Sequence, residues 1–236
     1  MMTARDYYQA HRQKIEHWLD LAVYPETEQY GRTEIPHKVS QRHDRTHRRG
    51  CLLRDQMRLQ RVADLTRSRR VLDIGAGYGD FAIFADNFRF ERLDATDPGG
   101  SQYRFLTEQW RAYDRVYDLP LQDMDLSGYD TLVLLGVWVP DWVATLRDHL
   151  LVHPGLRDVV MSINTWPRAG MVYEADADQW TGPWSYSHRV DRVMWYSEQL
   201  INSVFHNRGF HRAQVFRLAR SMDVTRVWLH YQRPGA

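Results

Sequence analysis

The sequence contains a single cysteine, Cys51, and only two lysines among its 31 basic residues. One cysteine excludes an internal disulfide framework and any multi-cysteine metal site. No apolar run approaches the ~20 residues that a membrane-spanning helix needs. The residues that follow Met1 contain no apolar signal-peptide core. Together these absences predict a cytoplasmic protein with no membrane partner.

The charges nearly cancel, with 30 acidic residues against 31 basic ones and a net charge of +1. Their distribution is uneven, because residues 32–70 carry 12 basic side chains and 4 acidic ones. This basic segment is either a solvated loop and helix surface or a surface that faces an anionic ligand. With 236 residues and 43% hydrophobic residues, the chain is long and apolar enough for one large folded domain, with or without an appendage.

The spacing of apolar residues changes near residue 71. Before it, residues 4–22 and 52–66 have the periodicity of amphipathic helices. After it, strand patterns alternate with helical patterns, and a helix is expected to begin after Ser197. The expected strands are 71–74, 89–97, 115–123, 131–137, 159–163, 211–218 and 224–231. This alternation predicts a doubly wound α/β sheet, residues 71–236, behind an N-terminal helical cap or lid, residues 1–70.

Residues 164–196 interrupt the alternation with seven tryptophans and tyrosines. So many aromatic side chains argue against disorder, and a long excursion between a strand and a helix is usually functional. Open α/β sheets bind ligands at the carboxyl ends of their strands, where this segment should leave the sheet. We therefore expect an aromatic insertion that overhangs a ligand-binding site.

A glycine-rich motif, V-L-D-I-G-A-G-Y-G-D, runs from Val71 to Asp80 and joins the first expected strand to a helix. The dinucleotide-binding fingerprint requires its third glycine at position 80, where this chain has aspartate. An acid near the start of a helix repels a pyrophosphate. The motif therefore argues against a nicotinamide or flavin dinucleotide as the ligand.

This motif resembles the first motif of the class I S-adenosylmethionine-dependent methyltransferases. Four further segments resemble landmarks of that family in the same order: Leu93–Asp97, Tyr129–Val133, Leu151–Gly155 and Tyr196–Phe210. The resemblance implies a Rossmann-like, doubly wound, seven-stranded sheet whose last strand is antiparallel. It also implies S-adenosyl-L-methionine as cofactor and S-adenosyl-L-homocysteine as product. Another Rossmann-like fold with a chance glycine loop is the alternative.

The resemblance also implies which residues contact the cofactor. An acid at Asp97 would accept hydrogen bonds from the ribose, and Asp123 would meet the adenine, with Asp118 as its alternative. Asp73 would orient the amino-acid portion or act as a structural cap. The full set is Asp73, Gly75, Ala76, Gly77 and Gly79 in the loop, Asp97 and Pro98, Asp123 and Met124, and Gly136, Val137 and Trp138 after the fourth strand.

Methyl transfer needs a base only if the acceptor is a hydroxyl or a protonated amine. His188 and Asp141 are the catalytic candidates, with Glu174 and Tyr186 as further ones; an imidazole titrates near neutrality. No metal site is expected. The histidine pairs His43/His47 and His149/His153 have helical spacing but no glutamate of the metalloprotease pattern between them.

Several methyltransferase subclasses are excluded by missing motifs. The sequence Gly136-Val137-Trp138-Val139 stands where amino-methyltransferases carry Asp/Asn-Pro-Pro-aromatic, and Cys51 lies far from where a cytosine-C5 nucleophile belongs. The expected function is methylation of O, N or C of a small molecule, such as a secondary metabolite or a nucleotide-linked sugar. The alternatives are an RNA-directed enzyme that uses residues 32–70 and a methyltransferase fold with a non-methylating role. A homodimer is left open.

Overall fold

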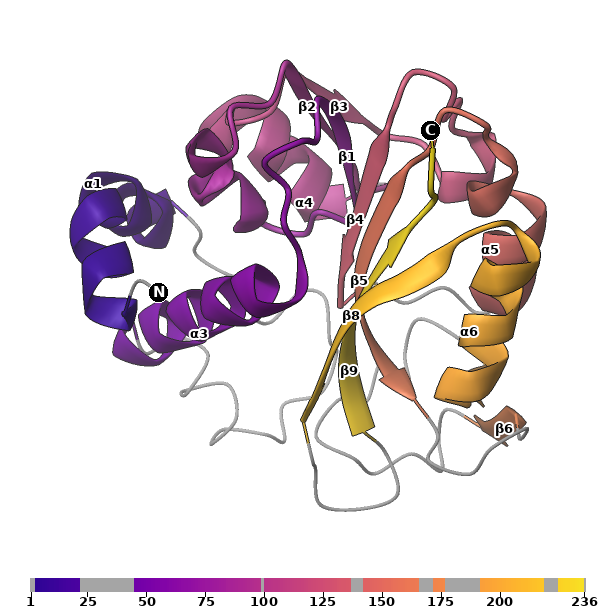
Figure 1. Ribbon diagram of the computed structural model, residues 1–236. Helices are drawn as coiled ribbons and strands as arrows, with labels where there is room; N and C mark the ends of the chain where they lie inside the picture. Colours follow the sequence, from indigo (N-terminus) through magenta and orange to yellow (C-terminus); the bar gives the residue numbers. More distant parts are fainter. Residues whose placement is uncertain are drawn as a thin grey trace.

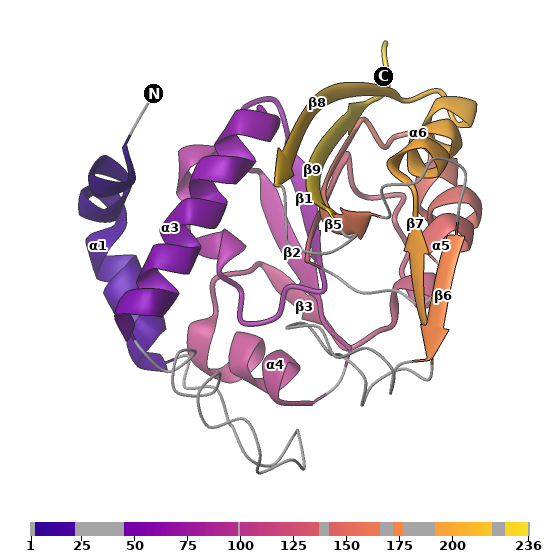
Figure 2. The ribbon, with the colours of Figure 1, turned by 90° about the horizontal axis from the view of Figure 1, so that it is seen from below.

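The computed structural model describes residues 3–21, 45–98, 100–136, 142–165, 172–176, 192–218 and 225–235. A seven-stranded sheet lies at the centre of the molecule, with helices packed on both of its faces (Figure 1). The α1 and α3 helices and the α4 helix lie on one face, and the α5 and α6 helices lie on the other (Figures 1 and 2). The predicted α/β class is confirmed.

The strands of this sheet follow the order β3-β2-β1-β4-β5-β9-β8. The neighbours from β3 to β5 pair in parallel, whereas β9 is antiparallel to both β5 and β8. The last strand in the chain is therefore antiparallel, as expected. Their bounds are β1 (Arg70–Ile74), β2 (Arg92–Thr96), β3 (Arg115–Tyr117), β4 (Thr131–Leu135), β5 (Asp158–Thr165), β8 (His211–Leu218) and β9 (Thr225–Gln232).

The helices create two separate apolar cores because successive strand residues point to opposite faces. Val71 and Val133 pack towards α1 (Ala4–Leu21), α3 (Arg45–Val62), α4 (Gly100–Arg104) and the π-helical segment η3 (Phe105–Trp110). Leu72 and Leu132 pack towards α5 (Trp142–Asp148) and α6 (Glu198–Asn207). Burial on both faces explains why the strand sequences read as continuous apolar runs.

One helix end is set by a side chain that the sequence indicated. The Ser197 hydroxyl accepts a hydrogen bond from the backbone N–H of Leu200 at 3.2 Å, at the start of α6. The α3 helix differs from expectation, because it begins at Arg45 rather than near residue 52 and ends at Val62. The expected strand 89–97 begins only at Arg92, because Arg89 has a φ of +55° that extended backbone does not allow.

Two other expectations were wrong. The helix expected after the glycine loop is replaced by two 3₁₀ turns, η1 (Phe81–Ile83) and η2 (Ala85–Asn87). Phe81 and Phe84 lie three residues apart, a spacing that suits a 3₁₀ turn as well as an α-helix. The third strand ends at Tyr117 rather than at residue 123, since Pro120 has no N–H to donate and a 3₁₀ turn, η4 (Leu121–Asp123), follows it.

The segment 164–196 contains a separate hairpin formed by β6 (Val172–Asp176) and β7 (Arg192–Tyr196). The two strands are antiparallel, with Val172 opposite Tyr196. Figure 2 shows the hairpin on the side of the sheet that α5 and α6 cover. The residues between its strands, including Trp180 and Trp184, lie outside the described part of the chain.

Candidate functional site

The candidate site lies where the carboxyl ends of β1, β2 and β4 meet. The β1 strand lies between β2 and β4. After β1 the chain adds β2 and β3 on one side, and it then crosses back to add β4 and β5 on the other side. Such a switch in strand order opens a crevice at the carboxyl edge of a doubly wound sheet, and ligands bind there. The glycine loop, Asp97 and Gly136 all follow strands at this edge.

The glycine loop is held by backbone bonds and by left-handed backbone. The N–H groups of Gly75 and Ala76 donate to the carbonyl of Thr96 at 2.7 and 3.3 Å. The φ angles of Gly75, Gly77 and Gly79 are +63°, +59° and +69°, a region that favours glycine. The loop therefore turns back onto the end of β2.

Two glycines of this loop have different surroundings. A Cβ on Gly79 would lie 2.8 Å from side-chain atoms of both Leu106 and Trp110, so this glycine allows the loop to pack on η3. A Cβ on Gly77 would meet nothing within 4 Å among the described residues. Gly77 is thus the point where a ligand can approach the backbone closely.

Asp97 lies beside Gly77. Its Oδ2 accepts a hydrogen bond from the Gly77 N–H at 2.6 Å, and its side chain is half-buried. A carboxylate only accepts hydrogen bonds, so it fits the hydroxyl donors of a ribose and repels a phosphate. The open approach at Gly77 and the acid at Asp97 together fit a nucleoside ligand. Pro98, the next residue, is exposed.

Asp73 lies beneath the loop and is buried. Its Oδ2 accepts a hydrogen bond from the Tyr113 hydroxyl at 2.6 Å. Burial raises the pKa of Asp73 to about 8, although the Tyr113 bond acts in the opposite direction. The structure therefore gives Asp73 a partner inside the protein, and its contact with a cofactor stays a prediction.

The residues expected to contact the adenine separate in the structure. Met124 is buried in the core below α5, whereas Asp123 is exposed in η4. Asp118 follows β3 directly, and the carbonyl of the preceding Tyr117 accepts a hydrogen bond from the N–H of Asp97 at 3.3 Å. Asp118 thus lies next to the ribose candidate along the edge of the sheet.

Gly136 ends β4 with a φ of +75° and donates its N–H to the carbonyl of Ser162 at 3.0 Å. Four other candidates, Val137, Trp138, Asp141 and His188, lie outside the described residues, as does Tyr186. For Glu174 the structure gives only its place in β6, opposite Met194. The structure therefore does not test the catalytic candidates.

Two tryptophans that the sequence did not single out hold the loop. The indole N–H of Trp18, from α1, donates to the carbonyl of Tyr78 at 2.7 Å. The indole N–H of Trp110, from η3, donates to the carbonyl of Gly79 at 3.0 Å. Both rings are buried, and a buried indole N–H needs an acceptor. The sequence showed Trp18 only as part of an apolar helix face, with no sign of this bond.

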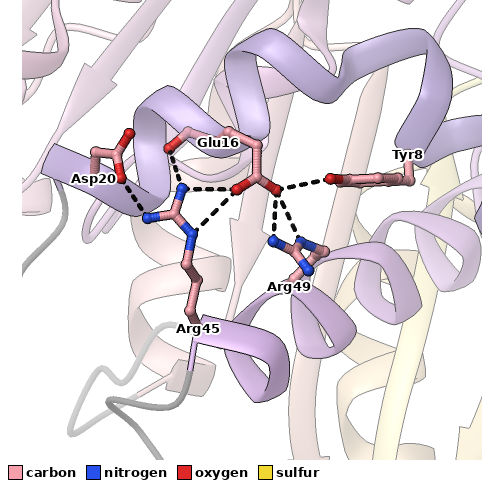
Figure 3. Close-up of polar contacts among 5 residues, drawn as sticks. All are labelled: Tyr8, Glu16, Asp20, Arg45 and Arg49. Carbon is pink, nitrogen blue, oxygen red and sulfur yellow. Dashed lines mark hydrogen bonds and ion pairs between the residues drawn. The ribbon is translucent and has the colours of Figure 1, made fainter.

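The basic segment is partly neutralised by α1 (Figure 3). Glu16 accepts hydrogen bonds from Arg45 Nη2 at 2.7 Å, from Arg49 Nε at 2.9 Å and from the Tyr8 hydroxyl at 3.0 Å. Arg45 also pairs with Asp20. These arginines link α3 to α1, and through α1 they support the position of Trp18.

Within the described ranges, no group of three or more histidine, cysteine or acidic side chains is placed to hold a metal ion. No helix in those same ranges is long and apolar enough to cross a membrane.

No protein-family model and no curated protein matches this sequence. Solved structures do match. The N-terminal domain of EvdMO1, in the presence of S-adenosylhomocysteine and D-fucose, has a TM-score of 0.59 at 14% identity and covers 94% of this chain and 96% of its own. The StiE O-methyltransferase has a TM-score of 0.58 at 16% identity, and the alignment covers 84% of this chain and 80% of its own.

A third match is the magnesium protoporphyrin IX methyltransferase ChlM from Synechocystis PCC 6803 with bound S-adenosylhomocysteine. Its TM-score is 0.55 at 15% identity, and the alignment covers 97% of both chains. The sheet order, the glycine loop and these matches define an α/β protein of the Rossmann-like class. More particularly, the chain has the fold of the class I S-adenosylmethionine-dependent methyltransferases.

Proposed function

We propose that this protein transfers a methyl group from S-adenosyl-L-methionine to a small molecule. The observation that carries the proposal is the open backbone at Gly77 with the Asp97 carboxylate beside it, in a class I methyltransferase fold. Four matching structures were solved with S-adenosylhomocysteine or in its presence, and another has S-adenosylmethionine bound.

The residues of this chain would act mainly by binding and orienting. Asp97 would accept hydrogen bonds from the ribose, and the backbone of Gly75–Gly79 would lie against the cofactor. Asp118 or Asp123 would meet the adenine, and Gly136, Val137 and Trp138 would line the methionine end. The cofactor supplies an electrophilic methyl group. Holding two reactants in line can lower a barrier by ~7–11 kcal/mol, so no further group is required for an acceptor without a proton to lose.

For an acceptor hydroxyl or protonated amine, His188 and Asp141 stay the proposed bases. The acceptor is a small molecule in this proposal, and a secondary metabolite or a nucleotide-linked sugar would suit it. Matching structures include a methyltransferase of magnesium protoporphyrin IX and one of 1,6-didemethyltoxoflavin. These acceptors differ widely, so they support a small-molecule class and not one compound. A cytoplasmic location and a homodimer remain part of the proposal.

The RNA-directed alternative has less support. It depends on arginines of residues 32–70 that are open to phosphates, yet Arg45 and Arg49 are engaged by acidic side chains of α1 (Figure 3). A salt titration of RNA binding would measure how many phosphate contacts the other arginines make, since such contacts make the affinity strongly salt-dependent.

Calorimetry with S-adenosylhomocysteine and NAD tests the cofactor. We expect S-adenosylhomocysteine to bind and NAD not to bind. Binding of NAD without binding of S-adenosylhomocysteine would overturn the proposal. Incubation with S-adenosylmethionine and a metabolite extract should then release S-adenosylhomocysteine, detected by mass spectrometry; cofactor binding without any such release would favour the non-methylating alternative.

A further inference from the structure

Arg226 brings a positive charge to the edge of the sheet where the candidate site lies. It is the second residue of β9 and lies opposite Asn164, near the end of β5. Because β9 runs antiparallel to β5, its first residues lie where the parallel strands end. Arg226 therefore reaches the same edge as the glycine loop and Gly136.

The guanidinium of Arg226 is fixed from its inner side. Its Nε donates to the hydroxyl of the buried Ser162 at 2.8 Å, and its Cζ lies 5.7 Å from the ring centroid of Trp228. A Cβ on Gly136 would lie only 3.2 Å from Arg226 Nη2, so the glycine leaves room for the guanidinium. Its two terminal nitrogens make no hydrogen bond to any residue that the structure describes.

Other charges lie near Arg226 without pairing with it. On α3, Arg58 is paired with Asp55 at 2.7 Å. Desolvation, and next the charge of Asp55, raise the pKa of Asp80, while Arg226 acts to lower it. Arg226 also acts to lower the pKa of Arg58. No carboxylate of the described residues lies within 4 Å of the Arg226 guanidinium.

A half-buried guanidinium that is held in place, with no counter-ion among the described residues, is suited to bind an anion. The outer nitrogens of arginine form a planar fork that matches two oxygens of a carboxylate or a phosphate. Ser162 fixes one side of this fork, and the other side lies against Gly136 at the carboxyl end of β4. The fork is thus oriented before any ligand arrives, which reduces the cost of binding.

We propose that Arg226 binds a carboxylate or phosphate group of the acceptor, so that the acceptor is an organic acid or a phosphate ester. This inference rests on the proposed methyltransferase function. The cofactor also carries a carboxylate, so the experiment must separate the two sources of the anion.

The test compares the wild-type protein with Arg226→Met, which keeps the apolar stem and removes the charge. Calorimetry first measures S-adenosylhomocysteine and 5′-methylthioadenosine, which lacks the carboxylate. We expect both to bind the variant as they bind the wild type. Benzoate and phenyl phosphate are then titrated into the S-adenosylhomocysteine complex, with benzamide as the neutral probe. At least one anion should bind the variant about tenfold more weakly, and benzamide should not distinguish the two proteins.

Arg61→Met is the matched control, because Arg61 carries the same charge on α3, where its guanidinium lies 5.7 Å from the ring centroid of Phe216. It should bind the anions as the wild type does. Equal anion binding by Arg226→Met and wild type would overturn the inference. Loss of S-adenosylhomocysteine affinity with unchanged methylthioadenosine affinity would also overturn it, because Arg226 would then serve the cofactor. Failure of the wild type to bind S-adenosylhomocysteine would instead overturn the proposed function itself.

Discussion

The two edges of the sheet differ in how their charged side chains are hydrogen-bonded. At the amino edge, acidic side chains accept hydrogen bonds from neighbouring strands, whereas at the carboxyl edge the charged side chains make fewer hydrogen bonds to the described residues. Asp130 accepts hydrogen bonds from the N–H groups of Arg69 and Arg70 at 3.2 and 3.0 Å. Asp158 bonds to His230 at 2.7 Å and to Gln232 at 3.0 Å. Across the sheet, Arg226 has one hydrogen bond within the described chain, to Ser162.

This difference separates stability from function. Polar groups at the amino edge fix strand positions, and their removal should change the free energy of unfolding more than ligand affinity. Groups at the carboxyl edge keep hydrogen-bonding capacity for a ligand, so their removal should mainly change affinity. Substitutions at Asp130, at Asp97, at Asp73 and at the two tryptophans that hold the glycine loop test the separation, from the largest expected effect to the smallest.

Asp130→Ala should cause the largest loss of stability. Asp130 is buried, and its removal leaves the backbone N–H groups of Arg69 and Arg70 without their acceptor. We expect the free energy of unfolding to fall by ~3 kcal/mol, measured by urea denaturation. The affinity of the remaining folded protein for S-adenosylhomocysteine should not change. A large loss of affinity in the folded fraction would break the comparison.

Asp97→Ala should lower the affinity for S-adenosylhomocysteine and leave the stability of the free protein nearly unchanged. A carboxylate that accepts hydrogen bonds from ribose hydroxyls contributes ~1.5–3 kcal/mol per bond, so affinity for S-adenosylhomocysteine should fall at least tenfold. The melting temperature without ligand should hardly change. Calorimetry and thermal melting measure the two effects.

Asp94→Ala is the matched control three residues away on the same strand. Asp94 is fully buried and accepts hydrogen bonds from Tyr129 at 2.5 Å and from Tyr117 at 3.3 Å. Its loss should lower stability and leave affinity in the folded fraction nearly unchanged. A greater loss of affinity at Asp94 than at Asp97 would contradict the assignment of the ribose acid.

Asp73→Asn should change how stability depends on pH. Burial raises the pKa of Asp73 from its ordinary value of 3.8 to about 8, so folding takes up a proton between these values. The contribution of this group to stability therefore falls as the pH rises through that window. Asparagine does not titrate in this range. The free energy of unfolding of the variant should therefore rise relative to that of the wild type from about pH 5 to about pH 8, by at most ~1.4 kcal/mol per pH unit. Urea denaturation across this range measures the difference.

A constant difference between the two proteins across the same pH range would show that Asp73 does not take up a proton on folding. Tyr113→Phe provides a second check. The Tyr113 hydroxyl acts to lower the pKa of Asp73, so its removal should move the window to higher pH.

Trp18→Phe and Trp110→Phe should give the smallest effects. Each keeps a ring in the core and removes one hydrogen bond to the glycine loop, worth ~1 kcal/mol. Affinity for S-adenosylhomocysteine should fall severalfold because the loop is less well held. Trp228→Phe is the control: the Trp228 indole N–H is buried and has no hydrogen-bond partner among the described residues, so its removal should cost no hydrogen bond. Equal loss of affinity in all three variants would indicate a general packing effect.

Much of this architecture could be predicted from local patterns. Apolar runs identified the buried strands, Ser197 indicated the start of α6, and the motif around Gly75 to Gly79 indicated the loop. These features depend on neighbouring residues, so periodicity and capping rules detect them. The spacing of Phe81 and Phe84 after the loop does not distinguish the two 3₁₀ turns found there from the expected α-helix.

The remaining parts of the site depend on contacts between distant segments. Trp18 lies 60 residues before Tyr78, and Ser162 lies 64 residues before Arg226. No local pattern records such pairs, since they exist only after the sheet has placed one segment beside another. In the sequence, Arg226 therefore cannot be distinguished from any other strand residue.

The position of β9 also affects the order in which the site can form during synthesis. The contacts of the glycine loop with α1, β2 and η3 involve residues from Trp18 to Trp110, which leave the ribosome early. The contact between Arg226 and Ser162 requires β9, which follows β8 and lies near the end of the chain. A nascent chain would thus complete its glycine loop first, and a chain that stops before Thr225 would have no β9 and therefore an unfinished sheet.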